Sequence, residues 1–197
     1  MRDRRVQRYT PVMTNFDRVA SFYQNHIEQI SVSVDAVVAA TSVAAEAAAA
    51  TIFNESKLII CGLGLDAAPA TLLSELLRNG LAHERPALPT IELMSRFSTP
   101  KEGSVNWLAQ QLAVLGQPED MAIIFACDLD ATDAEVIANA AHRRSIKTCW
   151  LGAEGPDICL SFDSDDPKVS LSMGHSAAIC LADLIELAMF GPMEESL

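Results

Sequence analysis

Acidic side chains gather at two points where a buried strand is expected to end. Asp66 comes shortly after the first short apolar run of the chain, and Asp128, Asp130 and Asp133 come after the third. The carboxyl ends of parallel strands meet at one edge of a sheet, where α/β proteins bind ligands. Because carboxylate oxygens suit Ca²⁺, Mg²⁺ or an amine, the pattern allows a cation or amine site. However, the spacing lacks the glycine and the final Glu of an EF-hand loop.

The same aspartates also have a simpler structural explanation. An Asp between a strand and a helix accepts hydrogen bonds from the first backbone N–H groups and complements the helix dipole. One carboxylate is enough for that role at each helix, so some of the four are in surplus. Two like charges about 4 Å apart repel by roughly 4 kcal/mol at an effective dielectric near 20. We therefore expect this edge of the sheet to exclude anions such as phosphate.

The remaining titratable side chains do not form an obvious catalytic or metal-binding set. Glu75 lies three residues before Arg78 on an expected helix, a spacing that favours a salt bridge. His26, His83 and His142 are scattered along the chain, which disfavours zinc. We expect no cofactor, and a divalent cation at the aspartates is the only alternative.

Composition excludes several classes of function. The net charge of -12 over 197 residues argues against direct binding of nucleic acid. Five cysteines without a CxxC spacing favour a reducing compartment. We expect no signal peptide, since no apolar core follows the N-terminal arginines, and no stretch reaches the ~18 apolar residues needed to span a bilayer. We expect a cytoplasmic protein with no membrane contact.

The hydrophobic pattern predicts how these side chains are positioned. Short apolar runs alternate with amphipathic segments, which is typical of an open parallel sheet covered by helices on both faces. The expected strands are 57–62, 90–94, 121–126, 147–151 and 158–162, and the expected helices between them and after them are 66–79, 104–115, 131–145 and 169–189. Two further helices, 15–30 and 34–54, are expected to form an N-terminal hairpin whose alanine-rich face packs between subunits.

Four segments carry a resemblance to a known family. They are Cys61–Ala68 (CGLGLDAA), Glu84–Ile91 (ERPALPTI), Leu115–Asp120 (LGQPED) and Leu181–Glu186 (LADLIE). Their order and spacing resemble the sugar isomerase (SIS) domain family, in particular the phosphoheptose isomerase and DiaA (DnaA initiator-associating protein) subgroup. The resemblance implies a flavodoxin-like, three-layer αβα sandwich with five parallel strands, forming a homotetramer. Residues 1–197 would be one SIS domain, with 1–54 for oligomer packing and 55–197 as the αβα core.

The resemblance also implies where the ligand pocket lies and how it has changed. The pocket positions are Gly62, Gly64, Asp66, Asp128, Asp130, Thr132 and Asp133. In the family, serines stand where this chain has the four aspartates, and Thr132 falls at an Asn position. Glu75 matches the family's catalytic Glu, but Leu171 and Ile179 stand where its partners on the last helix would be.

Three functions remain open on this basis. The first is a non-catalytic, oligomeric regulatory protein of the DiaA type, with DnaA as partner and Phe190 as a contact. The second is a phosphoheptose isomerase acting on sedoheptulose 7-phosphate, with Ser95, Arg96 and Ser98 restoring the phosphate contacts. The third is a binder of a cation or amine at the aspartates.

Overall fold

The computed structural model describes residues 14–80, 84–94, 102–127, 129–162, 164 and 166–192. Five parallel strands form one sheet in the order β2-β1-β3-β4-β5. The strands are β1 (Leu58–Gly62), β2 (Thr90–Met94), β3 (Met121–Phe125), β4 (Lys147–Leu151) and β5 (Ile158–Leu160). The helices are α1 (Asn15–Phe53), the single 3-10 turn η1 (Gly64–Asp66), α2 (Ala67–Asn79), α3 (Glu102–Leu115), α4 (Ala131–His142) and α5 (Pro167–Phe190).

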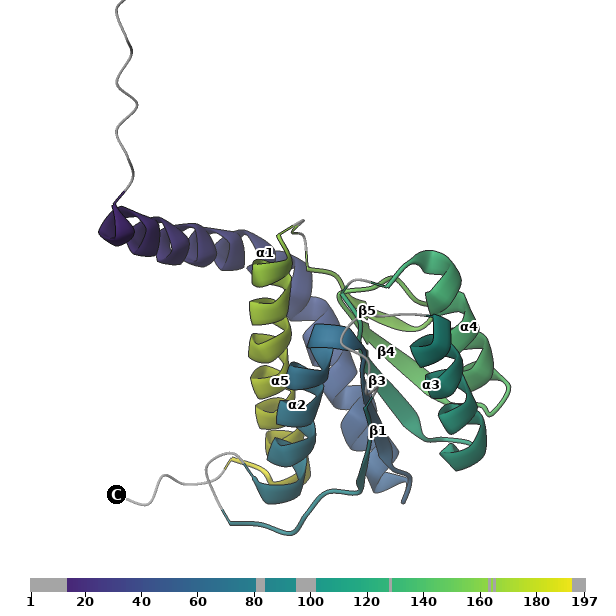
Figure 1. Ribbon diagram of the computed structural model, residues 1–197. Helices are drawn as coiled ribbons and strands as arrows, with labels where there is room; N and C mark the ends of the chain where they lie inside the picture. The colour runs from purple at the N-terminus through teal and green to yellow at the C-terminus, as the bar shows by residue number, and fades with distance from the viewer. Residues whose placement is uncertain are drawn as a thin grey trace, which may run out of the picture.

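The sheet is the middle of three layers. Helices α1, α2 and α5 cover one face, and α3 and α4 cover the other (Figure 1). Neighbouring strand residues point to opposite faces, so Ile60 joins the core under the first group of helices and Ile59 joins the core under the second. Both faces of β1 and β3 are fully buried, as their unbroken apolar sequences predict. The three-layer αβα sandwich with five parallel strands is thus confirmed.

The expected N-terminal hairpin is wrong, because α1 is one continuous helix of 39 residues. Ser33, which lies where the break between the two expected helices would fall, donates from its hydroxyl to the backbone carbonyl of Gln29 at 2.9 Å. Thr41 does the same with the carbonyl of Val37 at 2.7 Å. Hydroxyls satisfied in this way do not compete with the helix, and residues 31–35 include no glycine or proline that would end it. A capping box at Thr14 sets the start of the helix.

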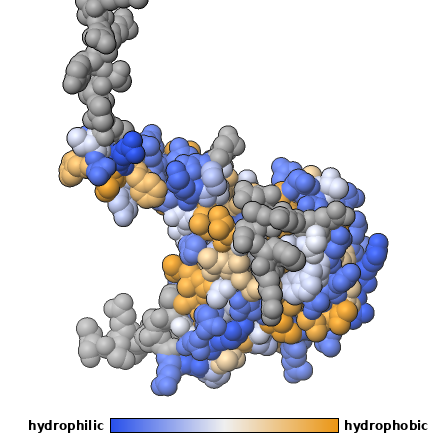
Figure 2. Space-filling view, in the orientation of Figure 1, coloured by the Kyte–Doolittle hydropathy of each residue, from blue (hydrophilic) through white to orange (hydrophobic). Residues whose placement is uncertain are grey.

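The two halves of α1 have different surroundings. The C-terminal half packs through alanines against the rest of the fold, whereas the N-terminal half extends away from it as an arm (Figure 1). The arm leaves large apolar side chains exposed among polar ones (Figure 2), namely Phe16, Val19, Phe22, Tyr23 and Ile27. By length and composition alone, α1 and α5 are apolar enough to cross a membrane, contrary to the expectation from sequence. A core helix passes the same test, and α5 packs against both α1 and α2.

The topology brings the loops after β1 and β3 together at the carboxyl ends of these strands. These strands are neighbours, with Gly62 paired to Phe125 at their ends. The chain leaves β1 toward α2 on one face and leaves β3 toward α4 on the other. Strand order reverses at this point, which is where open α/β sheets bind ligands. The loops that follow β1 and β3 hold the aspartates singled out from the sequence.

Candidate functional site

The loop after β1 is drawn tightly against the start of α2. A Cβ at Gly62 would lie 2.6 Å from the Cα of Ala67 and 2.8 Å from the Cβ of Ala70, so only glycine fits there. Gly64 has a φ of 60°, in the left-handed region that glycine adopts without strain. Leu63 donates its backbone N–H to the carbonyl of Phe125 at 3.2 Å. The two predicted glycines therefore shape the loop and hold it to the end of β3.

The Asp66 side chain reaches the loop after β3. Its Oδ2 accepts the backbone N–H of Cys127 at 2.6 Å, and the residue is 5% exposed. Its side chain makes no capping hydrogen bond to α2, although it precedes that helix directly. The carboxylate thus joins the two loops rather than capping its own helix.

The other aspartates behave differently from Asp66. Asp130 is exposed and accepts the backbone N–H of Asp133 at 2.9 Å, so it caps α4 as the structural explanation predicted. Thr132 is exposed on the first turn of the same helix. Asp128 lies outside the described residues. Within the described ranges, no group of three His, Cys, Asp or Glu side chains is placed to hold a metal ion.

Glu75 forms the salt bridge that its spacing predicted. Its two carboxylate oxygens accept from Arg78 and from Asn79, each at 2.9 Å, and its side chain is 51% exposed. Arg78 also donates to Glu92 at 3.2 Å, which extends the network along the surface to β2. On α5, Ile179 is exposed, and Nδ1 of His175 contacts the carbonyl of Leu171 at 2.8 Å within the helix. These observations describe Glu75 as a surface carboxylate in a salt-bridge network.

Sequence reasoning missed the partner of Arg85. The Arg85 Nε donates to the carboxylate of Glu186 on α5, and the side chains are 3% and 7% exposed. Arg85 also donates to the carbonyls of Leu76 and Leu77 at the end of α2, each at 2.9 Å. Its guanidinium lies 5.5 Å from the centre of the Phe190 ring. Arg85 therefore fixes its loop. It also covers part of the ring of Phe190, the side chain predicted to contact a protein partner.

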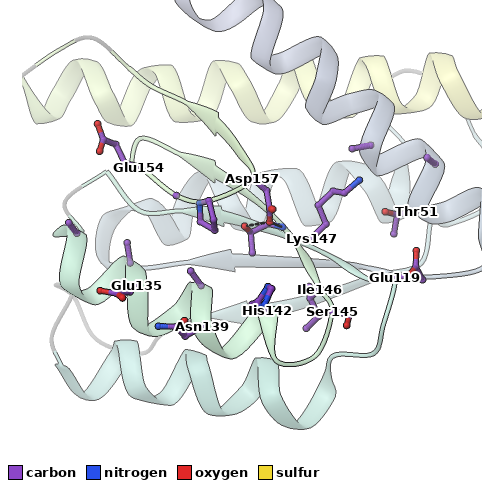
Figure 3. A pocket seen from close by; sticks show the side chains of 18 of the residues that line it. Thr51, Glu119, Glu135, Asn139, His142, Ser145, Ile146, Lys147, Glu154 and Asp157 are labelled. Carbon is purple, nitrogen blue, oxygen red and sulfur yellow. Dashed lines mark hydrogen bonds between the residues drawn. The ribbon is translucent and has the colours of Figure 1, made fainter.

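A groove of about 790 Å³ that the sequence did not indicate lies elsewhere on the molecule (Figure 3). It runs between the C-terminal end of α1, helix α4 and the loop from β4 to β5. Its lining includes Thr51, Glu119, Glu135, His142 and Lys147. Since Lys147 begins β4, this groove reaches the amino ends of the strands, opposite to the edge that holds Asp66. No spacing in the sequence brings these distant residues together.

Comparison with known proteins finds similarity to phosphoheptose isomerases. No protein-family model matches it. The phosphoheptose isomerase of Chromohalobacter salexigens is 29% identical over 156 residues, which are 72% of this chain and 79% of that protein. The solved phosphoheptose isomerase from Francisella tularensis has a TM-score of 0.77 and 26% identity, covering 88% of this chain and 98% of that one.

A more distant solved structure shows the fold alone. The sugar isomerase domain of an RpiR transcription factor from Sphaerobacter thermophilus has a TM-score of 0.59 at 20% identity, over 86% of this chain and 89% of that one. The two solved structures support the same overall fold. The chain therefore has an SIS-like α/β fold and is similar to phosphoheptose isomerases in sequence and structure.

Proposed function

We propose that this protein is a non-catalytic, cytoplasmic SIS-domain protein that acts as an oligomeric binding or regulatory protein. The observation that carries the proposal is the contact between the loops that follow β1 and β3. There the buried carboxylate of Asp66 holds the Cys127 N–H at 2.6 Å. A backbone N–H engaged by a carboxylate is not available to a phosphate oxygen, and the carboxylate itself repels phosphate.

The surroundings of Glu75 support the absence of isomerase chemistry. Moving a proton between adjacent carbons needs a base and an acid within hydrogen-bond reach of the substrate. The Glu75 carboxylate accepts from Arg78 and Asn79 on an exposed helix face. Leu171 and Ile179 have no group that can transfer a proton. Asp66, Asp130 and Asp133 also lack the hydroxyl donors that the resemblance would require at their positions.

The exposed arm of α1 supports self-association. It presents a stripe of large apolar side chains, and the next turns of α1 form an apolar groove of about 400 Å³ with α5. The groove lining includes Ile30, Val34, Val38, Met173 and Leu184. Two copies related by a two-fold axis can each place an arm beside the other's groove, because such a contact is self-complementary. We propose a second copy of this chain as the occupant, and a homotetramer as the assembly.

The proposal includes a protein partner that binds the oligomer, such as the initiator DnaA. Phe190 is 40% exposed at the end of α5, with Arg85 against one part of its ring. A half-exposed aromatic ring can anchor a partner surface. A pull-down with DnaA that loses its signal in Phe190→Ala, while oligomer size is unchanged, supports this part. Equal capture by both proteins contradicts the role of Phe190.

The second candidate is a phosphoheptose isomerase, favoured by the similarity to proteins of that name. The side chains that would restore its phosphate contacts, Ser95, Arg96 and Ser98, lie outside the described residues. A cation or amine binder is the third candidate, and the described part of the chain offers no cluster that supports it.

One experiment separates these candidates. The wild-type oligomer is titrated calorimetrically with sedoheptulose 7-phosphate, with and without Mg²⁺, and turnover of the same sugar is followed in parallel. The proposal predicts no turnover and binding weaker than millimolar in both conditions. Micromolar binding with turnover supports the isomerase. A heat of binding measured on titration with Mg²⁺ or an amine, in the absence of the sugar phosphate, supports the third candidate.

A further inference from the structure

The groove of about 790 Å³ between α1, α4 and the β4–β5 loop plays no part in the proposed function. Alanines line it from both helices, namely Ala47, Ala50, Ala131, Ala134 and Ala138. The start of β4 also lines it, because β5 pairs only with residues 149–151 and leaves the first turn of that edge open. At this edge the Thr148 N–H donates to the Asp157 carboxylate at 2.7 Å, so a bound segment cannot extend the sheet there. An occupant of the groove has to be recognised by side chains.

The groove carries an excess of negative charge. Its lining includes four carboxylates, one lysine and one histidine, namely Glu119, Glu135, Glu154, Asp157, Lys147 and His142. Glu135 and Glu154 lie near one end of the groove and Glu119 near the other (Figure 3). Within the described part of the chain, these three glutamate side chains are exposed and accept no hydrogen bond. Carboxylates without internal donors attract cations, so the groove favours a positively charged occupant.

The chain itself contains a positively charged segment, which lies outside the described residues. Residues 1–13 include four arginines and one aspartate, a charge of +3, which leaves −15 on residues 14–197. The arginines are Arg2, Arg4, Arg5 and Arg8. This segment and the groove are therefore complementary in charge, which favours their encounter and sets its specificity.

The length of the segment excludes binding in the groove of its own chain. Ala47, the first groove residue on α1, follows Thr14 by 33 residues, which is about 50 Å along a helix. A fully extended chain spans at most about 3.6 Å per residue, so Arg8 lies within about 22 Å of Thr14 and Arg5 within about 32 Å. The arm also extends away from the rest of the fold (Figure 1). These arginines can therefore reach only the groove of another copy.

We propose that segment 1–13 of one copy binds in this groove of a second copy, with its arginines paired to Glu119, Glu135 and Glu154. The self-association proposed above places the arm beside residues 30–42 of the neighbouring α1. In an antiparallel arrangement, the segment then arrives at the last turns of that helix, which border the groove. It has to pass around the helix, which is about 10 Å across. The inference goes beyond the proposed function but rests on its self-association.

The test is a zero-length cross-link in the full-length protein. Arg5→Lys keeps the charge of the segment and supplies an amine, which a carbodiimide couples to carboxylates in direct contact. Protein of natural isotope content and ¹⁵N-labelled protein are mixed in equal amounts, refolded together from urea and coupled, and the joined peptides are identified by mass spectrometry. We expect position 5 to be joined to Glu119, Glu135 or Glu154. A light and a heavy peptide should be joined as often as two peptides of the same label.

Two charge reversals in this background separate the groove from a general attraction to an acidic protein. Glu135→Lys should lower the coupling to Glu119 and Glu154 by about fivefold, because it replaces an attraction by a repulsion. Glu84→Lys makes the same change in net charge at an exposed carboxylate outside the groove lining, and it should leave the coupling unchanged. At 1 M salt, where the Debye length is about 3 Å, the coupling should fall in the protein that keeps both glutamates.

Three results would overturn the inference. One is the absence of coupling between position 5 and the groove, or its restriction to peptides of one label, in a protein that sediments as an oligomer. Another is coupling to Glu84 at the same frequency as to the groove carboxylates. The third is an equal loss of coupling in the two charge-reversal variants. A monomeric mass looks different, because it contradicts the self-association in the proposed function and the inference together.

Discussion

Replacing Glu186 by alanine should destabilise the fold strongly. The change removes the counter-charge of Arg85, whose side chain is only 3% exposed, so water cannot replace the lost carboxylate. Breaking a buried ion pair by removing one partner costs about 3–5 kcal/mol. Arg85 keeps its bonds to the carbonyls of Leu76 and Leu77, which favours the lower end, about 3 kcal/mol. For a chain of this size we expect the Tm to fall by about 6–12 °C.

The assay is urea unfolding followed by tryptophan fluorescence, since Trp150 is completely buried in the core. The protomer concentration is held constant because association adds to apparent stability. Glu75→Ala is the matched control: it also removes a carboxylate from an arginine, but this pair is exposed and should contribute less than about 1 kcal/mol. A loss below about 1 kcal/mol in Glu186→Ala, or equal losses in the two variants, would refute the reasoning.

Three further predictions concern packing, pH and association. Gly62→Ala should lower the free energy of unfolding by about 1–3 kcal/mol, because its Cβ has no space, whereas Gly103→Ala meets nothing within 4 Å and should be tolerated in the same urea assay. Burial, and secondarily the charge of Cys159, raises the pKa of Cys149 from 9.0 to about 12. The Cys149 thiol therefore stabilises the fold fully below pH 9, and its contribution to the free energy of unfolding should fall by about 1.4 kcal/mol per pH unit as the pH rises toward 12. Cys149→Ala should remove this contribution and keep that of the buried Cys61 thiol, whose pKa is also raised by burial. Ile27→Glu places a charge on the exposed stripe of α1 and should reduce the mass measured by sedimentation equilibrium; an unchanged mass with normal stability would contradict self-association through the arm.

The sheet could be predicted from sequence because its signals are local. Runs such as 58–62 and 121–125 are apolar without interruption, which marks strands buried on both faces. The break expected near Ser33 was wrong because a serine inside a helix can bond to the carbonyl four residues earlier, and no sequence pattern distinguishes this from a cap.

The sequence predicted where the candidate site lies in the fold, but not which hydrogen bonds and ion pairs its side chains form. The order of elements brings Gly62, Asp66 and the 127–133 loop to one edge of the sheet. Helix capping by Asp130 followed from its position before α4. The bond from Cys127 to Asp66 and the pairing of Arg85 with Glu186 link residues separated by 61 and 101 positions. Side-chain directions in loops decide such bonds, and they depend on the packing of the complete fold.

The most direct test of the account is the affinity of the wild-type protein for sedoheptulose 7-phosphate, measured by calorimetric titration with and without Mg²⁺. The account predicts binding weaker than millimolar in both conditions, because the carboxylate of Asp66 already accepts the Cys127 N–H between the loops after β1 and β3. Micromolar binding would contradict it, since the sugar phosphate would then have to displace a buried, hydrogen-bonded carboxylate.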